Sequence, residues 1–352
     1  MAVTAIPQHR AAPATPITRR RASTRALGLL ICIGLIAVLC FLSLAVGTRV
    51  TSLHSVWDAV VAYDPSNTDQ LVIRELRVPR TILGVLVGAA LGLAGAVMQG
   101  VTRNPLADPG ILGVNAGASL FVVIGITALG VTSPSGYVWF AFVGAAAASV
   151  VVYSIAALGR EGATPVKLAL SGAAITAAFT AVTSALLLVD QAAFDQFRFW
   201  SVGALAGRDM SIVVQITPFL VLGCALSLCL GRVLNTLSLG EDVARGLGAN
   251  VMLSRALSAG AVVLLCGAAT AACGPIGFVG LTIPHVARMI VGADYRWVLP
   301  YSMVLAPILL LVADILGRVI ARPGELQVAI VTAFLGAPVF IALVRRKKLA
   351  EL

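Results

Sequence analysis

Asp314 is the one carboxylate that lies deep in a long apolar stretch of this sequence. An acid in such a place could carry protons across a membrane. Arg318 follows it at the i, i+4 spacing of a helical ion pair, which favours mutual neutralisation near one membrane face over proton transport. His285 follows Pro284 in another apolar stretch, where a structural, hydrogen-bonded histidine is favoured over a ligand.

No catalytic pattern accompanies these residues. The phosphate-binding sequence G-x-x-x-x-G-K-[ST] is absent, and the lysines of the chain are Lys167, Lys347 and Lys348. The six cysteines show neither a C-x-x-C pair nor the spacing of metal ligands, so we expect free thiols and no metal site. The sequence therefore predicts neither an enzyme nor a bound cofactor, and active transport would need an ion gradient or a separate ATPase.

The composition narrows the class of protein. Hydrophobic residues make up 59% of the 352 residues and charged residues 11%, whereas a soluble domain carries about 25% charge. So few charges cannot cover a soluble surface, which excludes a soluble enzyme, a secreted disulfide scaffold and a disordered chain. The net charge of +10 is then attributed to loops beside a membrane rather than to nucleic-acid binding.

Ten apolar segments have about the length that a helix needs to cross a membrane. They are residues 27–47, 81–99, 110–130, 137–158, 168–189, 211–230, 255–273, 276–292, 298–317 and 326–344. Their short connections predict one all-α, polytopic membrane domain over residues 27–347. Residues 1–26, rich in Ala, Pro, Thr and Arg, are expected to form a disordered cytoplasmic tail. With both termini in the cytoplasm, most of the 25 basic residues fall inside, as the positive-inside rule requires.

Two predicted spans carry a distinctive face. Glycines recur every four residues from Gly84 to Gly92, which predicts close packing against another helix. In the fifth span, Thr176, Thr180 and Thr183 share one helix face. Their hydroxyls could bond carbonyls of their own helix or line a water-filled path, and the spacing leaves both interpretations open.

The segment between the sixth and seventh spans predicts a short cytoplasmic helix. Ser238 and Glu241 have the spacing of a capping box, and Glu241 and Arg245 that of a helical ion pair. Gly248 supplies a stop signal, which gives a helix over about 239–247. Such a helix could lie on the lipid surface or bind a cytoplasmic partner.

Basic residues also gather where the first outside loop meets the second span. Arg74, Arg77 and Arg80 lie there, although outside loops usually avoid positive charge. Lipid headgroups or an acidic docking partner would account for them.

Four ordered motifs resemble those of the permease subunits of bacterial ABC importers for iron-siderophores, haem and cobalamin, the FecCD-type family. They are RVPRTILGVLVGAALGLAGAVMQGVTRNPLADPGILGVNAGA (77–118), LSLGEDVARGLG (237–248), GPIGFVGLTIPHVAR (274–288), and VADILGR with VTAFLGAPVF (312–318 and 331–340). The likeness extends from about residue 27 to 347. It implies the ten-helix fold of the cobalamin-importer permease, a type II ABC importer.

The resemblance also implies partners. They are a second permease subunit, identical or paralogous, two cytoplasmic ATPase subunits that bind the ATP, and an extracytoplasmic substrate-binding protein. Membrane lipid surrounds the assembly, and no role for nucleic acid is expected. The chain itself would do no chemistry.

The resemblance further implies roles for individual residues. ATPase coupling falls on the short helix, at Glu241, Arg245 and Gly246. One part of a cytoplasmic gate falls on Asn104 and Leu106. The other part departs from the family, because small hydroxyl residues can stand there and this chain has Thr164, Pro165 and Val166. Binding-protein docking falls on Arg77, Arg80 and Arg318. From the threonine pattern we also expect Thr176 and Thr180 to line the translocation path.

These observations predict the permease subunit of an ATP-driven importer in the cytoplasmic membrane, with a ferric siderophore as its substrate. Haem and cobalamin are the alternative substrates within the same class. Two other classes compete with it: a secondary transporter that uses Asp314 as its proton carrier, and a membrane scaffold that transports nothing.

Overall fold

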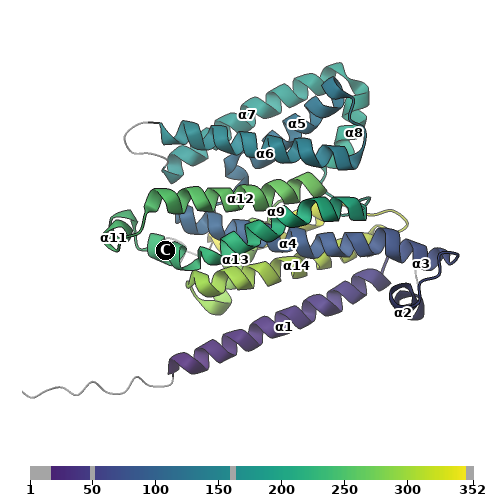
Figure 1. The fold of residues 1–352 in the computed structure, drawn as a ribbon, viewed down its shortest axis with the longest axis horizontal. Coiled ribbons are helices and arrows are strands. Elements are labelled where there is room, and N and C mark those ends of the chain that lie inside the picture. The colour runs from purple at the N-terminus through teal and green to yellow at the C-terminus, as the bar shows by residue number, and fades with distance from the viewer. Residues whose placement is uncertain (1–16, 48–51, 159–163, 346–352) are drawn as a thin grey trace, which may run out of the picture.

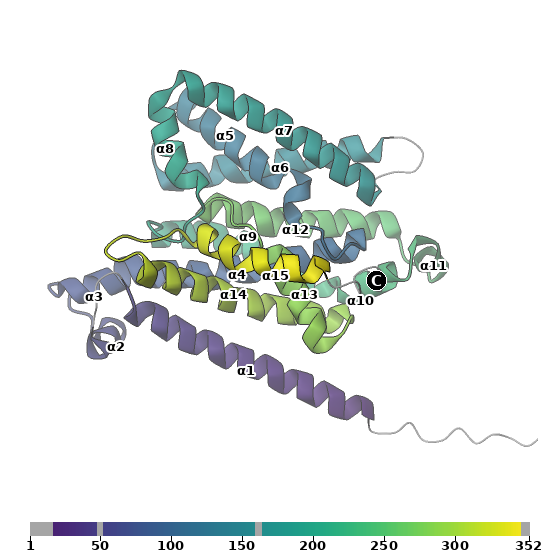
Figure 2. The same ribbon diagram turned by 180° about the vertical axis from the view of Figure 1, so that it is seen from behind.

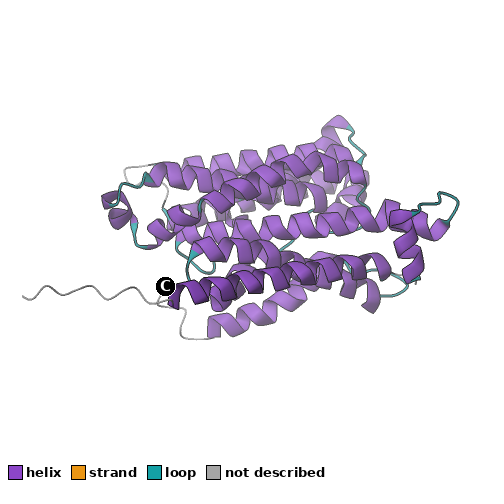
Figure 3. Cartoon of the chain, turned by 60° about the horizontal axis from the view of Figure 1, so that its bottom comes forward, coloured by secondary structure: helices purple, strands orange, loops and turns teal. Residues whose placement is uncertain are grey.

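The computed structural model describes residues 17–47, 52–158 and 164–345, and every regular element in these ranges is a helix (Figure 3). Ten long helices form the bundle: α1 (Ile17–Ala45), α4 (Val78–Thr102), α5 (Val114–Leu129), α6 (Pro134–Ala157), α7 (Pro165–Val189), α9 (Met210–Cys229), α12 (Val251–Cys273), α13 (Val279–Val291), α14 (Tyr295–Ile320) and α15 (Val328–Arg345). Short helices join them: α2 (Leu53–Val61), α3 (Thr68–Val72), α8 (Gln191–Ser201), α10 (Gly231–Ser238) and α11 (Glu241–Gly246).

The ten long helices coincide with the ten predicted spans. Among the described residues, seven helical stretches are long and apolar enough to cross a membrane, and α5, α13 and α15 are shorter apolar helices. An all-α, multi-pass membrane architecture is therefore confirmed. These three shorter members of the ten, α5, α13 and α15, are the helices whose segments Gly and Pro interrupt or whose ends lie inside the bundle.

The N-terminal boundary differs from the prediction. Helix α1 begins at Ile17, so the expected disordered tail over 1–26 is wrong for residues 17–26, while residues 1–16 lie outside the described ranges. The segment after Ile17 contains Ala and Arg, which are strong helix formers. The helix therefore continues beyond its apolar part, where hydropathy alone places no span.

Helix α4 occupies the centre of the molecule, with α14 beside it and the α5–α8 group on the far side of α12 (Figure 1). The predicted glycine stripe makes the α4–α14 contact possible. A Cβ at Gly92 would lie 2.3 Å from the backbone oxygen of Ser302, and one at Gly88 would lie 2.6 Å from the Cα of Pro307. No side chain fits in that space, so the packing interpretation of these glycines is confirmed.

Two helices begin inside the bundle rather than at its ends. After α4, residues 103–113 fold back along the bundle, and the 3₁₀ turn Pro109–Leu112 leads into α5. The start of α13 packs on α4 so closely that a Cβ at Gly95 would lie 1.9 Å from the carbonyl oxygen of Gly280. Irregular backbone at membrane depth is tolerated where protein surrounds it or where it lines a cavity.

The two ends of the bundle carry different short elements. Helix α11 lies at the end where α1 begins and α15 finishes, and α2, α3 and α8 lie at the opposite end (Figure 2). We refer to them as the α11 end and the α3 end. Helix α7 lies at the edge of the bundle. It is little covered, since 11% of the residues in its most apolar stretch are buried. Its uncovered apolar face must meet lipid or another subunit.

Candidate functional site

A cavity whose wall carries several hydroxyl groups opens between α5, α7 and α8. Its volume is about 330 Å³, and its hydroxyl-bearing and amide residues are Asn115, Ser119, Thr176, Thr180, Thr183 and Ser184. Small hydroxyl residues at membrane depth can line a path for a polar solute without introducing a charge. This cavity is therefore the candidate translocation path.

The three threonines of α7 divide between the two interpretations of their spacing. Thr183 is buried and donates its hydroxyl to the carbonyl oxygen of Phe179 at 2.7 Å, as a helix-bonded threonine does. Thr176 and Thr180 are exposed along the cavity wall. The structure thus places the three threonines along the same cavity, as their spacing indicates. The hydroxyls of Thr176 and Thr180 are available to a solute.

Asp108 and Asn115 are polar residues that the sequence reading did not select. Both line a second, smaller cavity inside the bundle, next to Cys266 and Thr270. The Asp108 carboxylate accepts a hydrogen bond from the backbone N–H of Gly110 at 2.7 Å, and Thr270 donates to the side-chain oxygen of Asn115 at 3.0 Å. Asp314 is therefore not the only carboxylate deep in the fold. Asp108 and Pro109 form a D-P pair, which favours a turn, but nothing in the local sequence indicates that this turn lies inside the bundle.

The predicted gate residues lie at the α11 end of this path. Asn104 and Leu106 form a turn in which the Asn104 side-chain oxygen accepts the Leu106 N–H at 2.9 Å. Thr164 caps α7 by accepting the N–H of Lys167 at 3.4 Å, and Pro165 and Val166 form its first turn.

The loop after α4 and the start of α7 touch each other. A Cβ at Gly172 would lie 1.8 Å from the carbonyl oxygen of Ile111, which belongs to the turn before α5. A shift of either segment must therefore move the other. A gate role for these segments stays a prediction.

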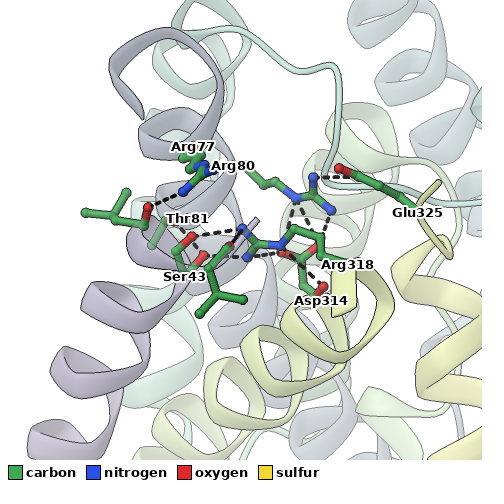
Figure 4. Close-up of polar contacts among 9 residues, drawn as sticks. Ser43, Arg77, Arg80, Thr81, Asp314, Arg318 and Glu325 are labelled. Carbon is green, nitrogen blue, oxygen red and sulfur yellow. Dashed lines mark hydrogen bonds and ion pairs between the residues drawn. The ribbon is translucent and has the colours of Figure 1, made fainter. Parts of the chain in front are cut away.

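At the α3 end, charged residues form one connected network (Figure 4). Arg80 donates from Nη2 to Asp314 at 2.8 Å and from Nη1 to Glu325 at 2.7 Å. Arg318 donates to the other oxygen of Asp314 at 2.7 Å and to the hydroxyl of Ser43 at 2.7 Å. The network ties α1, α4 and α14 together, and its charges balance. The predicted Asp314–Arg318 ion pair is confirmed.

The arginines expected to dock a binding protein are not free at the surface. Arg77, Arg80 and Arg318 are 6%, 9% and 1% exposed. Arg77 donates to the carbonyls of Leu44 and Ala45 at 2.7 and 3.0 Å. Neighbouring helices of the same chain therefore already bond all three guanidinium groups. A docking role for them stays a prediction.

The short helix at the α11 end is shorter than predicted and is capped differently. It spans Glu241–Gly246 and begins at Gly240, whose φ is 104°, without a side-chain cap. The capping-box prediction is wrong, because Ser238 ends α10 and donates its hydroxyl to the carbonyl oxygen of Asn235 at 2.7 Å. The predicted Glu241–Arg245 pair is present at 3.4 Å, and Glu241 also contacts Arg255.

The outward face of α11 is open. Val243 and Leu247 are 51% and 66% exposed, and a Cβ at Gly246 would meet no atom within 4 Å. The stop at Gly248 is confirmed, since its φ is 81° and its N–H bonds the carbonyl oxygen of Arg245. Exposed apolar side chains beside an arginine suit contact with a partner protein as well as with lipid.

Comparison with known proteins agrees with this architecture. The pattern of the FecCD transport family matches residues 35–346. The chain is 46% identical over 327 residues to the ferric enterobactin transport system permease protein FepD of Escherichia coli (strain K12), covering 93% of this chain and 97% of that protein. It is 44% identical over 328 residues to the Fe(3+)-citrate import system permease protein YfmD of Bacillus subtilis (strain 168), again covering 93% and 97%.

A solved structure shares the fold. An inward-facing conformation of an ABC transporter described as of the "metal-chelate type" matches with a TM-score of 0.79 and 28% sequence identity, covering 92% of this chain and 99% of that one. The family pattern, the relatives and this fold agree with an all-helical membrane permease. The chain belongs to the FecCD transport family of permeases.

Proposed function

We propose that this permease passes a ferric siderophore across the cytoplasmic membrane, with haem and cobalamin as the alternative cargoes. The observation that carries the proposal is the row of hydroxyl and amide side chains on the wall of the cavity of about 330 Å³ that α7 shares with α5 and α8. Hydroxyl and amide groups suit a polar chelate, since they bond its oxygens without holding it by charge. The ferric enterobactin and Fe(3+)-citrate permeases named above support this class of cargo.

The energy comes from a separate ATPase that binds α11. The sequence has no phosphate-binding loop, so the ATP is bound outside this chain and the permease needs no cofactor. The open face of α11, with Arg245, Gly246 and Leu247, suits a protein cleft. We place the α11 end, and with it both termini, in the cytoplasm, because the positive-inside rule favours that orientation.

The path is completed by a second permease subunit, identical or paralogous. Its contact surface is the uncovered face of α7, where Val166 and Leu170 are each 68% exposed. The α3 end then faces a substrate-binding protein. Among the predicted docking arginines, Arg80 has the most accessible partner, since the Glu325 side chain is 30% exposed.

Transport follows by alternating access. Closure of the ATPase dimer moves α11, and α11 passes the motion to α12 through the Glu241–Arg255 contact. The loop with Asn104 and Leu106 and the first turn of α7 then open or close together, because Ile111 and Gly172 leave no gap between them.

A proton-coupled secondary transporter is the weaker candidate. A proton carrier needs a carboxylate oxygen that can take up a proton. Both oxygens of Asp314 accept bonds from arginines: Oδ1 from Arg80, and Oδ2 from Arg80 at 3.1 Å and from Arg318.

Uptake in a strain that lacks the gene tests the cargo. Cells carrying the chain with its ATPase and binding protein take up labelled ferric siderophore, haem or cobalamin, each supplied alone. We expect uptake of a ferric siderophore that resists a protonophore while ATP is maintained. Uptake that collapses with the protonophore favours the secondary transporter, and unchanged uptake on deletion favours a scaffold.

Replacement of Gly246 by Trp tests the coupling helix. Gly246 has open space around it, so the larger side chain leaves the fold intact and blocks only a docked partner. We expect normal membrane abundance with loss of ATPase co-purification and of uptake. Retained co-purification and uptake would leave α11 as a helix on the lipid surface.

A further inference from the structure

A third cavity, of about 490 Å³, opens at the α11 end of the bundle, which we place in the cytoplasm. The ends of α4, α10 and α13 and the start of α14 form its walls. Its polar lining includes Gln99, Arg103, Ser238, Arg288 and Tyr295, and it contains no carboxylate. The cavity shares no lining residue with the cavity between α5, α7 and α8, although Pro105 of its wall lies between Asn104 and Leu106 of the predicted gate.

The two arginines of this cavity have no anionic partner. Within the described part of the chain, the ion pairs closer than 4 Å involve neither Arg103 nor Arg288. Arg288 is partly buried, and its guanidinium donates to the side-chain oxygen of Gln99. A partly buried charge without a counter-ion is costly, so this arrangement calls for an anion from outside the chain.

The loop carboxylate of Asp294, beside the cavity wall, is already engaged. Asp294 accepts from Arg296 at 2.8 Å and from the side-chain amide of Asn235 at 2.7 Å. These bonds, with Arg296 as the largest cause, lower the pKa of Asp294 to about 2. Asp294 therefore neutralises Arg296, although it adjoins two residues of the cavity wall.

The cavity is held in shape by backbone contacts. The Gln99 amide donates to the carbonyl of Leu281 at 3.1 Å, which turns its oxygen toward Arg288. Arg103 ends α4 in a left-handed conformation, with φ at 50°. That turn places the Nη1 of Arg103 3.8 Å from where a Cβ on Gly240 would lie, at the beginning of α11. Two guanidinium groups from different elements thus border one space.

We infer that this cavity binds a phosphoryl anion, either the headgroup of an anionic phospholipid or free phosphate. Arginine pairs tetrahedral oxyanions through several parallel N–H bonds, and the hydroxyl of Ser238 and the amide of Gln99 add polar contacts. The cavity is larger than one carboxylate needs and lies at the cytoplasmic boundary of the membrane, where phospholipid headgroups reside. The inference does not depend on which solute the permease carries.

The test uses the full-length chain purified in detergent, with one probe for each source. Equilibrium dialysis with radiolabelled inorganic phosphate measures the free anion. Native mass spectrometry after exchange into phosphatidylglycerol or phosphatidylcholine counts retained lipid. We expect one saturable site for phosphate or for phosphatidylglycerol, and none for phosphatidylcholine. Binding of phosphate alone identifies the free anion, and binding of phosphatidylglycerol alone identifies the headgroup.

Two variants and one matched control locate the site. Arg103→Gln and Arg288→Gln should each weaken binding at least about tenfold, which corresponds to about 1.4 kcal/mol. Arg232→Gln is the control, because Arg232 is an exposed arginine of α10 outside the cavity lining. If Arg288→Gln fails to fold, the exposed Arg103→Gln still decides the matter. Arg288→Lys, which keeps the charge, should retain part of the binding.

Two results would overturn the inference. One is the absence of saturable binding by either probe, or equal binding in all variants. The other is that both arginine variants bind phosphate and phosphatidylglycerol normally but no longer co-purify with the ATPase, which would assign the arginines to a carboxylate of that partner.

Discussion

At the α3 end of the bundle, Arg80 and Arg318 share the carboxylate of Asp314, whereas at the α11 end Arg103 and Arg288 border a cavity without any carboxylate. The first cluster is closed: its charges cancel, and its hydrogen bonds join three helices. The second is open and calls for an anion that the chain does not supply. The arginines of the two clusters therefore differ in what they indicate. A neutralised one holds helices together, and an unneutralised one points to a binding partner.

Removal of Asp314 should break the closed cluster and give the largest effect. Asp314→Ala leaves Arg80 and Arg318 buried without their shared counter-ion, and loss of one member of a buried pair costs about 3–5 kcal/mol. We expect a severe drop in membrane abundance and in the thermal unfolding temperature in detergent. Asp195→Ala is the control, since its side chain is 51% exposed and its pair with Arg198 lies at the surface. Equal stability of both variants would show that the cluster does not tie the helices.

Neutralisation of Glu325 should have a smaller effect, because this residue forms the outer, partly exposed edge of the same cluster. Its pair with Arg80 is 2.7 Å long, but its side chain is 30% exposed and water screens the charge. We expect Glu325→Gln to cost about 1 kcal/mol or less, as surface pairs do. The thermal unfolding temperature should thus stay close to that of the wild type. A loss as large as that of Asp314→Ala would mean that the cluster depends on both acids.

The smallest effect concerns the α11 end and appears as a pH dependence. Bonds from Arg296 and Asn235 lower the pKa of Asp294 to about 2, below its usual value of about 3.9. A lowered pKa in the folded state means that the carboxylate stabilises the fold above the unfolded value. This contribution disappears as the pH falls from about 4 toward 2.

The stability difference between wild type and Asp294→Asn should therefore shrink across that window. Thermal unfolding at a series of pH values measures it. Because the Asp294 side chain is 25% exposed and its partner Arg296 is 61% exposed, water screens the pair and the effect is modest. A difference that stays constant down to pH 2 would show that Asp294 does not titrate there. A large loss of phosphate binding in the same variant would show that Asp294 shapes the anion cavity after all.

The sequence predicts the features that depend on local pattern. The ten spans follow from long apolar runs, and the Asp314–Arg318 pair follows from one helical turn of spacing. The shared face of Thr176 and Thr180 follows from the same helical period.

The features that depend on contacts between distant parts of the sequence could not be predicted. Arg80 lies 234 residues from Asp314 in the sequence, so its pairing emerges only when α4 packs on α14. Asp108 follows a turn signal that is equally compatible with a surface loop. Ser238 has the spacing of a capping box, but α10 continues through it and leaves Gly240 to begin α11.

Uptake of a ferric siderophore by a Thr180→Trp variant tests the proposed path most directly. Thr180 is an exposed residue of α7 on the cavity wall, so an indole there fills the space without disturbing a packed core. Ile31→Trp is the matched control, because Ile31 is 63% exposed on α1, away from the cavity. At equal membrane abundance and equal ATPase co-purification, we predict that Thr180→Trp abolishes uptake and Ile31→Trp retains it. Undiminished uptake by Thr180→Trp would contradict a path between α5, α7 and α8.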